Sequence, residues 1–157
     1  MRHDIARIAV VVAGLICAAG GLALGGANWS GQQPYTLAVP EHITGTGAEQ
    51  ARSGSLDMPL DHDTPCTITV SVAKAGDEVL ASAGDTLVTS YKLTGAALQN
   101  GGDGDWVDSS TFLTRNYSVP ETGPPDGITI WVRAAAGSGR ANNAGTYSAS
   151  VILTASW

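Results

Sequence analysis

Three aspartates lie close together and are the first residues of the sequence that could do chemistry. Asp103, Asp105 and Asp108 are spaced through a glycine-rich stretch, and carboxylates in such a loop suit a hard cation such as calcium. The spacing lacks the further ligands and the closing glutamate of an EF-hand loop. A solvated hairpin loop is the simpler interpretation of the cluster. We therefore predict a protein without a metal ion or cofactor, with a calcium site as the alternative at these three residues.

Side chains suited to catalysis are few. Downstream of the N-terminal leader the histidines are His42 and His62, and neither lies near a nucleophile motif such as Gly-x-Ser-x-Gly. His62 stands between Asp61 and Asp63, but adjacent side chains on an extended chain point to opposite sides. The pattern favours a solvated turn over an imidazole held for proton transfer. We predict that the protein is not an enzyme.

Two tryptophans could bind a ligand by stacking. Trp131 lies on the polar face of an alternating segment over residues 128–133, and Trp106 follows the glycine- and aspartate-rich loop. An indole combines an apolar ring with a polar N–H group, and two exposed indoles would suit a sugar. A sandwich also buries such residues in part. A carbohydrate- or surface-binding module is therefore our alternative prediction of function.

The N-terminus has the form of a secretory signal peptide. Two arginines flank the start of an almost uncharged run from Ile8 to Ala27, and small residues at 25–27 offer a cleavage site before Asn28. An uncleaved membrane anchor is the alternative, because about twenty apolar residues can span a bilayer. We expect residues 1–27 to be removed during export. The protein would then be secreted, and only this segment would meet the membrane.

The overall composition limits the possible partners. The chain has 157 residues, with 14 acidic and 8 basic side chains and a net charge of −6. Such an acidic chain is a poor partner for nucleic acid or for an anionic membrane surface. Cleavage would remove Cys17 and leave Cys66 without an internal disulfide partner. We predict that Cys66 is a buried thiol that packs as a small apolar group.

The rest of the chain is organised as short strands separated by turns. Glycine and aspartate stand where turns are needed, at residues 73–77 and 83–85. The stretch 106–117 is strand-like, and no segment downstream of the leader has the period of a helix. Short strands at regular spacing predict an all-β, antiparallel sandwich. We expect an extended N-terminal arm over residues 28–54 and a single sandwich domain over residues 55–157.

The clearest single element is the last strand. Between Thr146 and Trp157 apolar residues alternate with hydroxyl-bearing ones, with Ile152 as the one exception in the polar row, which predicts a strand with one buried face. Because a chain end frays unless neighbours hold it, this strand must lie within a sheet. The apolar row is the predicted assembly strand and comprises Tyr147, Ala149, Val151, Leu153 and Trp157.

Part of the sequence resembles a known group of proteins. The opening Gly145-Thr-Tyr147 and the alternating strand that follows, together with segments 84–93 and 128–133, resemble bacterial spore coat U-type and chaperone-usher fimbrial subunits. The resemblance implies an incomplete sandwich of immunoglobulin type, in which another subunit's N-terminal extension supplies the missing strand. It also implies a periplasmic chaperone and an outer-membrane usher as partners. The lone Cys66 departs from the disulfide that many of these proteins carry.

The function expected from this resemblance is structural. We predict a secreted subunit of a surface fibre, pilus or coat that assembles with identical subunits through strand complementation. Two alternating segments are candidate donors, with Pro59 marking the second as an edge strand or a strand end. Their residues are Tyr35, Leu37 and Val39 in the first, and Leu56, Met58 and Leu60 in the second.

Overall fold

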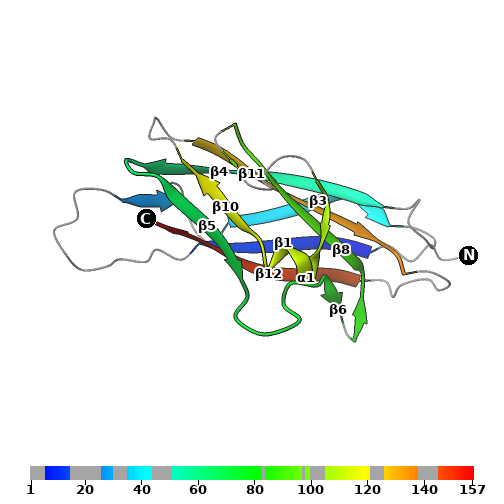
Figure 1. Ribbon diagram of the computed structural model, residues 1–157. Coiled ribbons are helices and arrows are strands. Elements are labelled where there is room, and N and C mark those ends of the chain that lie inside the picture. The colour runs from blue at the N-terminus through cyan, green and yellow to red at the C-terminus, as the bar shows by residue number, and fades with distance from the viewer. Residues whose placement is uncertain are drawn as a thin grey trace, which may run out of the picture.

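The computed structural model describes most of the chain as two β-sheets packed against each other (Figure 1). The described residues are 6–14, 26–29, 35–43, 51–82, 84–96, 98–99, 105–120, 126–137 and 145–157. Strands dominate these residues, so the predicted all-β sandwich is confirmed. Within the same ranges no helix has the length and apolar character needed to cross a membrane.

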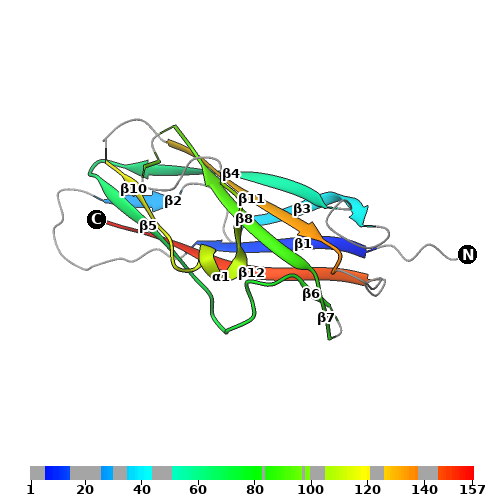
Figure 2. The ribbon, with the colours of Figure 1, turned by 45° about the vertical axis from the view of Figure 1, so that its right-hand side comes forward.

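The first sheet, sheet A, contains the closing strand at its centre. Its strand order is β10 (Asn116–Val119), β5 (Cys66–Ser71), β12 (Gly145–Ser156), β1 (Ala6–Gly14) and β3 (Tyr35–Ile43). The short β6 (Ala81–Ser82) pairs with β12 and with β7 (Asp85–Thr86). Neighbouring strands are antiparallel apart from β1 and β12, which run parallel. Figure 2 shows β1 between β3 and β12.

The second sheet, sheet B, is antiparallel throughout. Its strand order is β2 (Ala27–Trp29), β4 (Arg52–His62), β11 (Asp126–Ala135), β8 (Val88–Thr94) and β9 (Val107–Asp108). β4 and β8 flank β11 along most of its length. Because β2 pairs only with residues 60–62 of β4, Pro59 lies where no described strand flanks β4 on the side away from β11. β4 as a whole is nevertheless an inner strand between β2 and β11 that continues past Pro59 to His62, so the prediction of an edge strand or a strand end at Pro59 is wrong.

The core follows the period of two that the sequence predicts. In β11 the side chains of Ile128, Ile130 and Val132 are buried, while Thr129 and Trp131 lie on the outer face and are half-buried. The closing strand behaves in the same way, with its apolar row buried from residue 147 to residue 155. Each such aliphatic side chain contributes about 1.5–3 kcal/mol on burial. The two inner faces therefore supply most of the stabilisation of the sandwich.

Residues 106–117, which we predicted to be strand-like, contain one turn of helix between two strands. This helix, α1 (Ser109–Phe112), begins after Asp108, whose Oδ1 accepts a hydrogen bond of 2.9 Å from the Thr111 N–H group. An aspartate at this position satisfies an N–H group that otherwise has no partner at a helix start. The turn brings Phe112 into the core, where its ring stacks on that of Tyr91 at 4.9 Å.

Two predicted turns are confirmed by their backbone. Gly76 has φ +97° in the turn after β5, and Gly84 has φ +81° between β6 and β7. Only glycine adopts such angles without strain. The second turn folds Asp85 back toward the core, where its carboxylate is buried.

The N-terminal third differs from the expected extended arm. β2 and β3 fall inside residues 28–54 or at their border, yet they belong to the two sheets of the domain. The reason is burial, because the Trp29 side chain is 3% exposed and that of Leu37 is 1% exposed. His62, which we expected in a solvated turn, ends β4 and is also buried. Its Nδ1 lies 3.1 Å from the Thr64 carbonyl oxygen.

Candidate functional site

The closing strand β12 is paired on both of its edges. On one side it pairs with β5 over residues 152–156 and with β6 at Ser148. The Ser150 N–H group also donates to the Asp77 carbonyl oxygen at 2.7 Å on this side. The other edge, from Gly145 to Leu153, pairs with β1. The predicted assembly strand is thus a central strand whose second neighbour is the N-terminal segment.

The neighbour β1 comes from the predicted signal peptide. Its register places Ile8 beside Tyr147, Val10 beside Ala149 and Val12 beside Val151. Its other edge pairs with β3, where Val10 lies beside Leu37. β1 therefore joins two strands that are not paired with each other among the described residues. Removal of residues 1–27 would open a strand-wide gap between β12 and β3.

Both candidate donor segments lie inside the sandwich of their own chain. Tyr35, Leu37 and Val39 belong to β3, which ends sheet A and has β1 as its described in-sheet partner. The second segment, 56–60, belongs to β4 and pairs with β11. The two candidates therefore differ in how much of the fold each would disturb on leaving it.

Trp157 departs from the rest of the apolar row. It follows the end of β12, and its side chain is 46% exposed, whereas Tyr147, Val151 and Leu153 are buried. A Cβ atom added at Gly26 would lie 3.7 Å from the Trp157 ring. The predicted row is confirmed in the core from Tyr147 to Leu153, and Trp157 lies outside the core beside the predicted cleavage site.

A buried hydrogen bond fixes the start of β12. The Tyr147 hydroxyl donates to Asp85 Oδ2 at 2.6 Å, and both side chains are buried. The other carboxylate oxygen accepts a hydrogen bond of 3.0 Å from the Thr86 N–H group. Since a buried carboxylate is costly without such donors, Tyr147 and Asp85 stabilise each other. Sequence reasoning selected Tyr147 for its place in the apolar row and missed this contact with the turn at Gly84.

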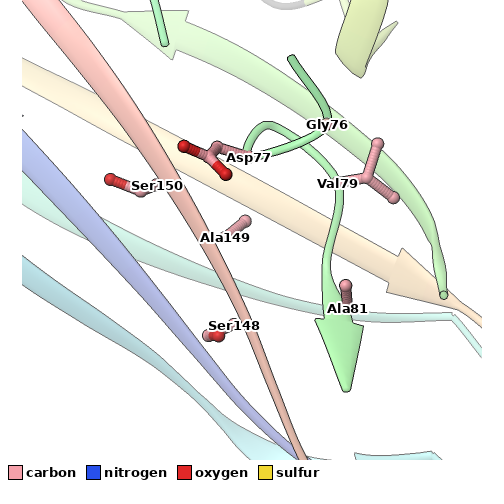
Figure 3. A pocket seen from close by; sticks show the side chains of 7 residues that line it. All are labelled: Gly76, Asp77, Val79, Ala81, Ser148, Ala149 and Ser150. Atoms are coloured by element: carbon pink, nitrogen blue, oxygen red, sulfur yellow. The ribbon is translucent and has the colours of Figure 1, made fainter. Parts of the chain in front are cut away.

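A cavity of about 460 Å³ lies between β12 and the turn after β5 (Figure 3). Small side chains surround it, and Figure 3 shows the Asp77 carboxylate beside Ser150. That carboxylate accepts a hydrogen bond of 3.1 Å from the Lys74 N–H group. The lining residues, with no histidine or cysteine among them, are Gly76, Asp77, Val79, Ala81, Ser148, Ala149 and Ser150. The Asp77 carboxylate is thus held by the backbone of its own turn.

The two candidate stacking residues are brought together on the outer face of sheet B. The Lys92 ammonium lies 4.8 Å from the centre of the Trp131 ring and 5.1 Å from that of Trp106. The Arg133 guanidinium lies 4.7 Å from the Trp106 ring. We name these four residues the outer-face cluster. The sequence pattern indicates the two indoles but not the two cations, because Lys92 and Arg133 lie far along the chain from the rings that they contact.

The remaining candidates for chemistry are dispersed. Asp108 serves as the helix cap, and hydrogen bonds from Ser110 and Thr111 hold the pKa of its carboxyl well below the usual range. Asp103 lies outside the described residues, and Asp105 is exposed. No group of three or more potential metal ligands occurs in the described ranges. Cys66 is buried, as predicted.

Comparisons with known proteins give no indication of the function. A scan against protein-family models finds no match, and a search of curated proteins finds none either.

Proposed function

We propose that the protein is a secreted structural subunit that assembles by strand complementation. The observation that carries the proposal is the position of β1. A segment with the form of a cleavable leader occupies a full strand position between β12 and β3, parallel to the first and antiparallel to the second. Once the leader is cleaved, both facing edges lose their partner. Unpaired strand edges readily accept a strand from another chain.

The geometry favours β3 over β4 as the donor segment. β4 pairs with β11 in a continuous register from Arg52 to Leu60, so its release would dismantle sheet B. β3 is an end strand whose described in-sheet partner is β1. After cleavage β3 is the strand most easily exchanged. In our proposal the segment 35–43 of one subunit fills the gap beside β12 of the next.

The energetics suit a stable but exchangeable contact. An incoming strand adds main-chain hydrogen bonds, each with a net value of about 0.5–1.5 kcal/mol. Apolar side chains at alternate positions, such as Tyr35, Leu37 and Val39, each add about 1.5–3 kcal/mol when buried. Because donor and acceptor edges are different surfaces, the contact is heterologous and continues from subunit to subunit. The assembly would be a fibre, pilus or coat at the cell surface.

The same gap explains the partners that the sequence resemblance implies. A chain with an open strand position and an exposed core would aggregate in the periplasm. A chaperone that lends a strand would cover the gap, and an outer-membrane usher would exchange that strand for the next subunit. The product would be of the incomplete immunoglobulin type, completed by its neighbour.

The experiment compares the full chain with a chain that starts at Asn28. We expect the chain 28–157 to form oligomers in size-exclusion chromatography coupled to light scattering. A peptide with the sequence of residues 6–14 should hold it as a folded monomer. The same peptide with Val10→Pro should fail, because proline removes a ladder hydrogen bond in the middle of the strand. A chain 28–157 that stays monomeric at high concentration and binds neither peptide would refute the proposal.

A further inference from the structure

The outer face of sheet B carries a row of side chains that runs from β11 across β8 to the residue before β9. The β8–β11 register places Lys92 beside Trp131. On the other side Tyr91 pairs with Val107, which brings the preceding residue, Trp106, next to Lys92. All three side chains of the row are half-buried. The row therefore presents two indoles with an ammonium group between them on an open sheet face.

The two cations of the outer-face cluster have no acidic partner within the described ranges. Lys92 and Arg133 lie over indole rings at 4.7–5.1 Å, and no carboxylate of the described residues forms an ion pair with either. This is notable in a chain with a net charge of −6. A guanidinium stacked on a ring keeps its N–H donors in its own plane. Both cations can therefore still donate to an anion.

The surroundings of the cluster combine a fixed polar contact with a small, mostly apolar cavity. The Trp131 Nε1–H group donates to Thr94 Oγ1 at 2.9 Å, which fixes the orientation of that indole. Arg133 and Ser90 also line a cavity of about 170 Å³, whose other walls are Ala51, Val88 and Ala135. Val88 is 57% exposed at its rim. A carboxylate that entered this cavity would meet a guanidinium and a hydroxyl.

We propose that the outer-face cluster binds a saccharide chain that carries carboxylates, such as a polyuronate. A pyranose ring has an apolar face that can lie on an indole, and its hydroxyls can bond to the serine and threonine side chains of the same face. The carboxylates would take hydrogen bonds from Lys92 and Arg133. An acidic peptide such as polyglutamate fits less well, because it has no ring whose apolar face could lie on the two indoles.

The test is calorimetric titration of the full chain with oligogalacturonate. Methyl-esterified oligogalacturonate and polyglutamate serve as comparison ligands. We expect binding to unesterified oligogalacturonate alone, and added salt should weaken this binding. Lys92→Met and Arg133→Leu should each weaken it about tenfold, as the loss of a charge-assisted hydrogen bond implies. Trp131→Phe should retain more affinity than Trp131→Ala. Lys74→Met, which removes an exposed cation from the turn after β5, is the matched control and should bind normally.

Several results would overturn the proposal. Equal binding of the ester would show that the carboxylate is not recognised, and preferential binding of polyglutamate would assign the face to an acidic peptide. An equal loss of affinity in Lys74→Met would show that the net charge of the protein alone causes the effect. Thermal unfolding of each variant separates lost binding from lost fold. The inference is independent of strand complementation, because assembly of the chain 28–157 and saccharide binding by the full chain are separate measurements.

Discussion

The hydroxyl of Tyr147 gives a quantitative test of how β12 is held in the core. It donates to Asp85 Oδ2 at 2.6 Å, and the two side chains are 0% and 3% exposed. Tyr147→Phe keeps the buried ring and removes one donor from a buried carboxylate. A hydrogen bond to a charged group has a net value of about 1.5–3 kcal/mol. We therefore expect the free energy of unfolding to fall by about 2 kcal/mol.

The assay is urea denaturation of the full chain, supported by thermal unfolding. For a domain of this size a loss of about 2 kcal/mol lowers Tm by roughly 4–8 °C. Tyr117→Phe is the matched control, because the Tyr117 ring is equally buried while its hydroxyl has no hydrogen-bond partner within the described ranges. Without a lost hydrogen bond, the control should cost less than about 0.5 kcal/mol.

A double-mutant cycle with Asp85→Asn isolates the contact. The coupling energy between the two positions should be about 1–2 kcal/mol, since the residues touch directly. The reasoning is refuted if Tyr147→Phe costs no more than Tyr117→Phe. A coupling energy near zero would likewise mean that the hydrogen bond does not stabilise the start of β12.

Three further predictions concern packing and pH. Gly95→Ala should lower the free energy of unfolding by about 1–3 kcal/mol in urea denaturation, because the added Cβ would lie 2.9 Å from the Gly127 carbonyl oxygen. Gly127→Ala is the control and should be nearly neutral, because open space surrounds that position. Burial raises the pKa of Tyr117 from 10.0 to about 12. Between these pH values the folded state binds more protons than the unfolded state, so the free energy of unfolding should fall as the pH rises. Denaturation at several alkaline pH values should show that the free energy of unfolding falls less with pH in Tyr117→Phe than in the parent. An equal slope in the two proteins would contradict the raised pKa of Tyr117. The pKa of Asp108 lies below its ordinary 3.8, so its stabilisation is present above that pH and is lost as the pH falls below it. The free energy of unfolding of Asp108→Asn should therefore fall less with decreasing pH than that of the parent. An identical fall in the two proteins would count against the role of Asp108 as the helix cap.

Local patterns in the sequence predicted much of the sandwich. The alternation in β12 and β11 identified strands and inward faces correctly, because a period of two determines which face each side chain occupies. The turns at Gly76 and Gly84 followed from residue type, since positive φ angles favour glycine. The cap at Asp108 could have been recognised from Asp-Ser-Ser-Thr at residues 108–111, but the flanking strand-like residues outweighed it.

Long-range pairing could not be predicted in the same way. The run Val10–Val12 is as typical of a strand as of a leader, and nothing in the sequence indicates its place between β12 and β3. The polar neighbours of Trp29 favour an extended arm, yet its ring lies in the core. The outer-face cluster depends on Lys92, which lies between the tryptophans only because β8 pairs with both β9 and β11.

The measurement that most directly tests the central claim is amide hydrogen exchange along β12. The chain 28–157 would be compared as a monomer and as an assembled oligomer, with amides on the β5 side of the strand as the internal reference. We predict rapid exchange in the monomer for the amides of residues 146–153 that face the β1 position, and strong protection of the same amides after assembly. Equal protection of these amides in the monomer and in the oligomer would mean that the strand position beside β12 is already filled within one chain. That result would contradict assembly by strand complementation.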